Sequence, residues 1–184
     1  MEAASTFPSE VLVGQGTDRD TEFADFFGAT WGRVFRTTYA VAMDRSLAED
    51  AVQTAFAKAY AAWDRVRAAD HPEAYVRRMA VNEVLTVFRR PWFRSERSGD
   101  LPDDAQAPSH ESSSVTRDAL WRAVTTLPPR QRAVVVLRYY EDLSEAEIAE
   151  VLGCSRGTVK SQASDALRRL RVMEAEVDRT GDPT

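Results

Sequence analysis

The chain has 184 residues, of which 43% are hydrophobic and 29% are charged, and its formal net charge is −5 at pH 7. This composition suits one globular domain or two small ones with modest cores. The apolar run at residues 133–137 is far too short to span a bilayer, and the polar N-terminus lacks the basic start and apolar centre of a signal peptide. We therefore expect a soluble, cytoplasmic protein that does not insert into membranes.

Cysteine and histidine are scarce in this sequence. Cys154 is the only cysteine, and His71 and His110 are the only histidines. Neither a disulfide framework nor a Cys/His metal cluster can be assembled from so few residues. The sequence therefore predicts no metal site and no cofactor, and Cys154 is interpreted as a small residue in a turn.

The first predicted helix carries an aromatic face. It follows a flexible leader at residues 1–17, and its apolar side chains recur every three or four residues, as in a helix that packs one side against a core. These side chains are Phe23, Phe26, Phe27, Trp31, Val34, Phe35 and Tyr39. Core packing is their expected role.

Two further helices are predicted in the N-terminal half. Ser46 and Glu49 have the spacing of a capping box, which indicates the start of a second helix whose apolar stripe reaches Trp63. A third helix begins at Pro72, a residue suited to a first helical turn, and ends before Pro91. Because no strand-like alternation of useful length is present, the predicted fold class is all-α.

The composition changes sharply after these helices. Residues 99–118 hold five acidic residues and one basic residue, together with prolines and a run of serines, a mixture that cannot bury a core. The sequence therefore predicts two small helical domains, at residues 18–94 and 115–173, joined by a flexible acidic linker at 95–114. A polar tail is expected at residues 174–184.

The C-terminal domain carries the pattern of a helix-turn-helix. Ser144 and Glu147 form a capping box, Gly153 suits a tight turn, and Ser155 is a good N-cap for a second helix. The polar face of that second helix can hydrogen-bond base edges or phosphates in a major groove. It consists of Arg156, Thr158, Lys160, Ser161, Gln162 and Ser164. The alternative is an ordinary helical hairpin with a solvated charged face.

Basic residues gather in two separate places despite the negative net charge. Residues 151–171 hold five basic residues against one acidic residue, and residues 75–97 hold six arginines against two glutamates. Two basic modules on a tether suit a protein that contacts two separated places on one DNA. A single regulator domain would not need both patches.

Four segments together resemble the bacterial extracytoplasmic-function (ECF) sigma factors, the small promoter-recognition subunits of RNA polymerase, and in particular their SigE-like actinobacterial type. They read AEDAVQTAFAKAY from Ala48, HPEAYVRRMAVNEV from His71, LPPRQRAVVVLRYYEDLS from Leu127, and the helix-turn-helix. The resemblance covers nearly the whole chain. It implies an alternative sigma factor with no enzyme activity, whose partners are core RNA polymerase, promoter DNA and, as a candidate, an anti-sigma protein.

The resemblance also implies contacts with polymerase. Asp50, Gln53 and Phe56 match the surface that docks on the coiled coil of the β′ subunit, although the first two also suit a solvated face and Phe56 also suits the core. Residues 130–132 (Arg130, Gln131 and Arg132) resemble the part of the C-terminal domain that approaches the β subunit.

A second implied site reads the minus 10 promoter element. Asn82 matches the residue that reads an extruded base, and Tyr75 matches an aromatic near the junction of duplex and melted DNA, with core packing as its alternative. The implied phosphate contacts, which as an alternative are solvated helix ends, are Arg77, Arg78, Arg89 and Arg90. Trp92 either stacks or packs.

A third implied site reads the minus 35 element. The family pattern places Lys160 and Ser161 at the groove, and its further positions are Arg138, Arg156, Thr158 and Ser164. Asp165 departs from the pattern, because relatives commonly carry arginine there. A carboxylate at this position either accepts from a cytosine amine or pairs with a neighbouring arginine, Arg168 or Arg169, and we favour the ion pair.

Two other classes of protein compete with this interpretation. A stand-alone helix-turn-helix regulator shares the C-terminal motif but leaves the segments around Ala48 and Tyr75 without a purpose. An enzyme needs convergent polar groups, whereas adjacent carboxylates such as Glu49 and Asp50 point in different directions on a helix.

Overall fold

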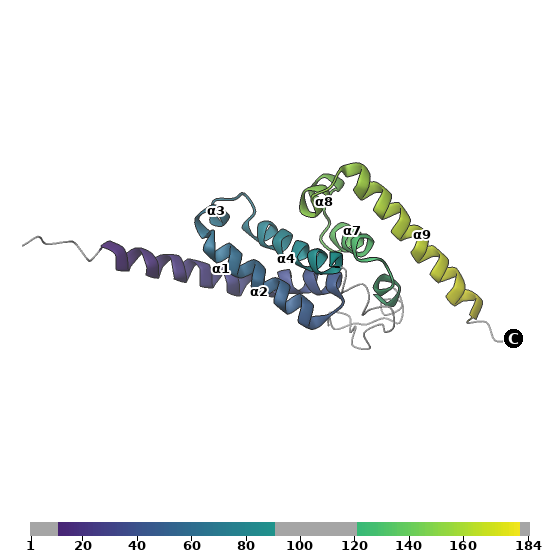
Figure 1. The fold of residues 1–184 in the computed structure, drawn as a ribbon, viewed down its shortest axis with the longest axis horizontal. Coiled ribbons are helices and arrows are strands. Elements are labelled where there is room, and N and C mark those ends of the chain that lie inside the picture. The colour runs from purple at the N-terminus through teal and green to yellow at the C-terminus, as the bar shows by residue number, and fades with distance from the viewer. Residues whose placement is uncertain (1–10, 91–120, 181–184) are drawn as a thin grey trace, which may run out of the picture.

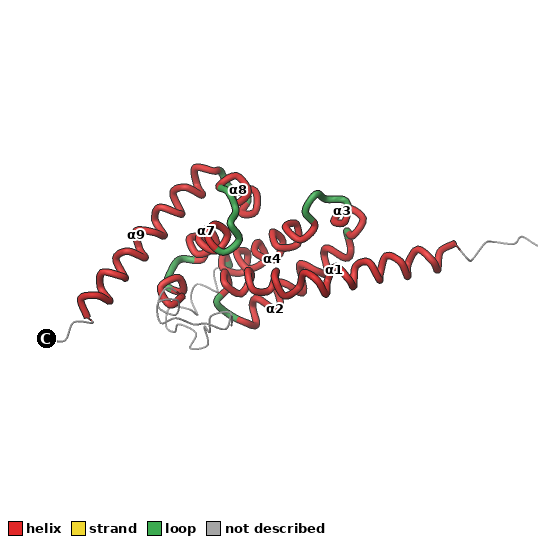
Figure 2. Tube along the Cα trace, turned by 180° about the vertical axis from the view of Figure 1, so that it is seen from behind, coloured by secondary structure: helices red, strands yellow, loops and turns green. Residues whose placement is uncertain are grey.

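The computed structural model describes the backbone of residues 11–90 and 121–180, and the side chains of residues 18–90 and 121–173. Within these ranges it contains helices and connecting turns but no strand, which confirms the all-α prediction (Figure 1 and Figure 2). The predicted linker at 95–114, residues 1–10 of the predicted leader, and Trp92 lie outside the described residues. Besides the helical residues 121–125, the helices are α1 (Val11–Ala42), α2 (Arg45–Ala61), α3 (Trp63–Arg67), α4 (Pro72–Arg89), α7 (Pro129–Tyr139), α8 (Glu145–Leu152) and α9 (Arg156–Thr180).

The helices α1 to α4 form an N-terminal module. Its three long helices pack against one another in pairs, and the first turns of α1 extend beyond the other two (Figure 1). A buried cluster inside this module includes Val34, Val52, Phe56, Trp63 and Val76. The aromatic face predicted for the first helix thus supplies much of the contact between α1 and α2, through the rings of α1 that surround Phe56.

Several helix ends differ from the sequence prediction. The N-cap of α2 is Asp44, whose Oδ1 accepts a hydrogen bond from the backbone N–H of Leu47 at 2.9 Å, so the predicted capping box at Ser46 is wrong. An aspartate with extended backbone is as good a cap as serine, and it lies two residues upstream. The helix α1 begins at Val11, inside the predicted leader, and α9 continues to Thr180, through part of the predicted tail.

The helices α7, α8 and α9 form a C-terminal module in which α8 and α9 are the predicted helix-turn-helix. Both halves of the capping box at Ser144 and Glu147 are present. Hydrogen bonds from the Ser144 side chain and backbone lower the pKa of Glu147 below its ordinary value. The stabilisation that these hydrogen bonds give the folded state is therefore fully present above the ordinary pKa of glutamate. It is lost as the pH falls through the lowered pKa of Glu147.

Gly153 makes the turn between α8 and α9 with a φ of 60°. A β-carbon at this position would meet nothing within 4 Å, so alanine would be opposed by backbone strain alone. We expect Gly153→Ala to lower the free energy of unfolding by about 1 kcal/mol. Gly28→Ala is the matched control, because Gly28 lies inside α1 with equally open surroundings and alanine should stabilise it there by roughly 0.5–1 kcal/mol. Urea denaturation measures the free energy of unfolding of both variants. A change of the same sign in both would contradict backbone strain as the cost of alanine at position 153.

The two modules share a continuous buried core. One cluster joins Val41 of α1 and Val84 of α4 to Leu137 of α7 and Ile148 of α8. The helix α7 packs on α1 and α4, and α8 packs on α4. The modules are therefore in direct contact, an arrangement that a flexible tether alone does not require.

Candidate nucleic-acid interface

The polar face of α9 is open to solvent at its N-terminal end. Arg156, Lys160, Ser161 and Ser164 are exposed, and Thr158 is half-buried. Ser155 caps the helix by accepting the backbone N–H of Thr158 at 3.1 Å, as predicted. The opposite face is fixed in the core by Val159, Ala163 and Ala166. The predicted groove-facing side chains are thus held on one free surface by a packed helix.

Asp165 forms an ion pair with Arg168 one turn further along α9. This confirms the ion pair favoured from the sequence and identifies Arg168 as the partner. The pair is partly exposed, so it adds little to stability. Arg138, at the end of α7, pairs with Glu145 at 3.1 Å and is half-buried, so it is engaged within the C-terminal module.

The predicted minus 10 residues on α4 differ in how exposed their side chains are. Arg78, Arg89 and Arg90 are exposed, as phosphate contacts require. Tyr75 is half-buried against the core of the N-terminal module, and its hydroxyl accepts a hydrogen bond from Arg65. Its ring therefore has a structural role, and the guanidinium carbon of Arg65 lies over it, 5.5 Å from the ring centroid.

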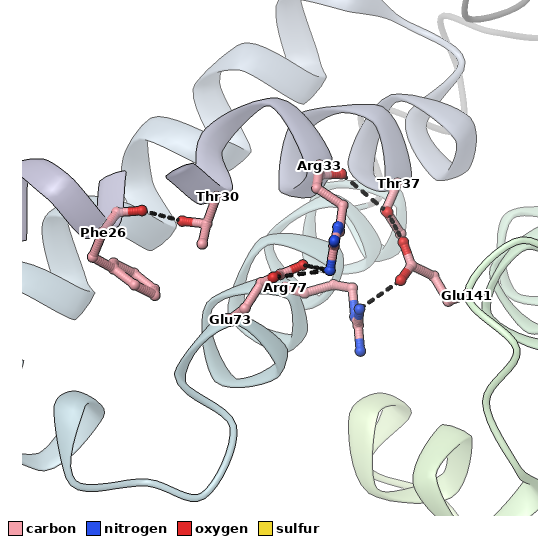
Figure 3. Close-up of polar contacts among 7 residues, drawn as sticks. All are labelled: Phe26, Thr30, Arg33, Thr37, Glu73, Arg77 and Glu141. Atoms are coloured by element: carbon pink, nitrogen blue, oxygen red, sulfur yellow. Dashed lines mark hydrogen bonds and ion pairs between the residues drawn. The ribbon is translucent and has the colours of Figure 1, made fainter. Parts of the chain in front are cut away.

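Arg77, which is buried, and Asn82, which is half-buried, both contact the C-terminal module. Arg77 is buried and its Nη1 lies 2.5 Å from Oε2 of Glu141, just after α7 (Figure 3). Nδ2 of Asn82 donates to the backbone carbonyl of Val151 in α8 at 2.7 Å. Sequence analysis missed both partners, since one is a glutamate in a loop and the other a backbone oxygen.

The predicted polymerase-binding residues on α2 also separate by exposure. Asp50 and Gln53 are exposed, whereas Phe56 is only 3% exposed and packs among the rings of α1. Phe27, which the sequence pattern assigned to the packed face of α1, is 40% exposed, and Tyr60 of α2 is 41% exposed. The hydroxyl of Tyr60 donates a hydrogen bond to Asp20 of α1. This hydrogen bond and the negative charge of the Asp20 carboxylate raise the pKa of Tyr60.

The predicted β-subunit segment at the start of α7 is largely turned inward. Arg130 is exposed, but Gln131 and Arg132 are buried. Nε of Arg132 donates to the carbonyl of Val41 in α1 at 2.8 Å, so this arginine contacts the N-terminal module. Of these three residues, only Arg130 is exposed for contact with another protein.

Sequence comparison assigns the same two modules. Residues 27–94 match the Sigma-70 region 2 family and residues 117–170 match the family described as Sigma-70, region 4. The chain is 34% identical over 154 residues to the RNA polymerase sigma-E factor of Streptomyces antibioticus, covering 82% of this chain and 83% of that protein. The chain belongs to the sigma-70 family, as a sigma factor of the ECF type.

Two further similarities extend this assignment. The ECF RNA polymerase sigma factor SigW of Bacillus subtilis is 28% identical over 177 residues, covering 84% of this chain and 89% of that one. In fold, the chain resembles the sigma factor RpoE crystallised with the anti-sigma factor NepR from Bartonella quintana. The TM-score is 0.67 at 24% identity, covering 84% of this chain and 97% of that one. Among the described residues of this sigma factor, no helix is long and apolar enough to cross a membrane.

Proposed function

We propose that this sigma factor binds core RNA polymerase through the exposed face of α2 and contacts promoter DNA at two places. Asn82 reads the melted minus 10 strand, with Arg78, Arg89 and Arg90 on phosphates, and Lys160 and Ser161 read the minus 35 element. The observation that carries the proposal is the combination in one chain of a region 2 match with a capped helix-turn-helix whose polar face is free. A stand-alone regulator needs only the second.

Promoter opening in this scheme needs no catalytic group. A flipped base gives up stacking and pairing, which costs a few kcal/mol, and contacts to the single strand offset that cost. Stacking on an aromatic side chain such as Tyr75 contributes about 1–3 kcal/mol for each base. Binding energy for the unpaired strand therefore favours the open promoter without nucleotide hydrolysis.

Run-off transcription tests the proposed function. The purified chain is mixed with core polymerase and fragments of its own genome, and a transcript that starts at a defined site and requires the chain is the expected result. A stand-alone regulator gives no such transcript, and its absence would contradict the proposal. Because polymerase and chromosome share the cytoplasm, that is the compartment we propose. An anti-sigma partner also stays a prediction, which co-purification of the native protein tests.

Lys160→Ala should weaken binding to minus 35 duplex DNA. Lys160 is exposed near the N-terminus of α9, and each lost phosphate contact lowers the slope of log affinity against log salt by about 0.9. Filter binding over a series of salt concentrations measures the slope. Arg171→Ala is the matched control, since Arg171 is exposed on the same face about 16 Å further along the helix. Equal slopes for wild type and Lys160→Ala would exclude a phosphate contact by Lys160.

A further inference from the structure

The centre of the polar face of α9 carries mostly small side chains. Residues three or four positions apart lie on the same face of a helix. Along the exposed side of α9 this spacing joins Gly157, Ser161, Ser164 and Arg168. The hydroxyl of Ser161 already donates to the backbone carbonyl of Thr158 at 3.0 Å. Serine contacts base edges without a strong preference, so Arg168 is the residue on this line best able to distinguish one base pair from another.

The guanidinium of Arg168 is held in one place although it is exposed. Its Nη2 donates to Oδ1 of Asp165, and the exposed fractions of the two side chains are 73% for Arg168 and 39% for Asp165. Because Asp165 lies one turn earlier, the ion pair selects arginine rotamers that lean toward the N-terminus of α9. Fixing a long side chain before DNA arrives reduces the conformational entropy that is lost on binding.

Stability does not account for a carboxylate at this position. Asp165 is the only acidic residue within residues 156–173, and it lies beside the face that is proposed to approach phosphates. A partly exposed pair adds little to the fold, whereas a carboxylate near DNA is repelled by the phosphate charges. The position of Asp165 is therefore better explained by its effect on Arg168 than by its contribution to the helix.

An arginine held in this way matches the major-groove edge of a guanine. A guanidinium has five N–H donors and no acceptor, and Asp165 takes one of these donors. The remaining donors include a pair that can bind O6 and N7 of guanine together. Guanine is the base that presents two acceptors side by side in the major groove, so this contact selects one base against the other three.

We propose that Arg168 reads a guanine of the minus 35 element and that Asp165 is its positioning residue. This inference rests on the proposed function, which brings α9 to the minus 35 element. Along the helix axis Arg168 lies about 10 Å beyond Ser161. Its guanine therefore lies within about three base pairs of the bases that Ser161 approaches.

Selection of bound duplexes from a random-sequence library tests the reading of guanine. The full chain, bound to core polymerase, should enrich duplexes in which one position of the minus 35 element requires guanine. Arg168→Ala should lower the preference for guanine at that position by about ten- to a hundredfold and leave the other positions unchanged. An equal loss of affinity for every sequence would identify a phosphate contact and overturn the proposal, as would an unchanged preference.

Asp165→Ala should have two effects of opposite sign. The affinity for all sequences should rise, because a negative charge beside DNA is removed, while the preference for guanine should fall about threefold at the position that Arg168→Ala affects. The double variant should lose no more preference than Arg168→Ala alone, since Asp165 acts through Arg168. A changed preference at a different position, such as one that requires cytosine, would refute the positioning role.

Arg169→Ala is the matched control. Arg169 is also exposed and follows Arg168 directly, but it lies about 100° away around the helix, so its removal should leave every base preference unchanged. Urea denaturation should give the same free energy of unfolding for Asp165→Ala and the wild type. A large loss of stability in Asp165→Ala would assign the ion pair to the fold and overturn the positioning role.

The same selection with the full chain alone separates this inference from the proposed function. If run-off transcription fails, the proposed function is lost. A guanine preference of the chain alone that disappears in Arg168→Ala would still support the reading of guanine. The absence of any enriched sequence, with and without polymerase, would overturn it.

Discussion

Asn82→Ala is expected to reduce promoter opening by roughly ten- to a hundredfold while sparing the binding of core polymerase. A paired donor and acceptor contact to a base contributes about 1–3 kcal/mol of discrimination, and alanine offers neither group. Permanganate reactivity of unpaired thymines in the minus 10 element measures opening directly. Pull-down with core polymerase measures the other half of the prediction, since the proposed polymerase contacts lie on α2.

Glu83→Ala is the control for this experiment. Glu83 is the next residue on α4, is half-buried, and pairs with Lys58 of α2. Losing this partly exposed pair should cost little stability and leave opening intact. Thymine reactivity that is the same in the wild type and in Asn82→Ala would remove Asn82 from the minus 10 site.

Phe56→Ala is expected to abolish polymerase binding by unfolding the N-terminal module. Phe56 is 3% exposed, and its ring lies 4.8 Å from that of Phe27, in an edge-to-face arrangement. Truncating a buried phenylalanine costs about 3–5 kcal/mol, which is a large part of the stability of a small domain. Urea denaturation followed by circular dichroism should record the loss of stability. Pull-down with core polymerase should record the loss of binding.

Two companion variants separate packing from contact. Phe56→Leu fills most of the same space and should keep both stability and binding. Gln53→Ala removes an exposed side chain on the same helix, so it should lower polymerase binding without a measurable change in stability. If Phe56→Leu folds normally but loses polymerase, the ring contacts polymerase directly and its packing role is secondary.

The local chemistry of the helix-turn-helix was predictable because each signal acts over a few residues. Ser144 and Glu147 cap α8, and Gly153 adopts the left-handed conformation that ends it. The start of α2 shows the limit of such signals, since Asp44 and Ser46 both suit a cap and only the backbone conformation decides between them. The polar face of α9 followed from the spacing of Val159, Ala163 and Ala166 in the core.

The docking of the two modules could not be predicted from local patterns. Glu141 lies 64 positions from Arg77 and 104 positions from Thr37 along the chain, and no spacing rule connects them. The same basic and amide side chains on α4 suit DNA contact and intramolecular pairing equally well, because both partners offer oxygen acceptors. Charge segregation therefore predicted two DNA-binding modules but gave no information on whether they associate.

The acceptor for Asn82 is a backbone carbonyl, and every amino acid at position 151 would provide it. No substitution at position 151 can therefore abolish this hydrogen bond by removing its acceptor, whereas a substitution of Asn82 can remove its donor. The hydrogen bonds that Glu141 accepts from Arg77 and Thr37 are made by side chains, so substitutions at position 141 can remove them. The polar contact between the two modules can therefore change through a substitution at position 141, without any change in the sequence of α9.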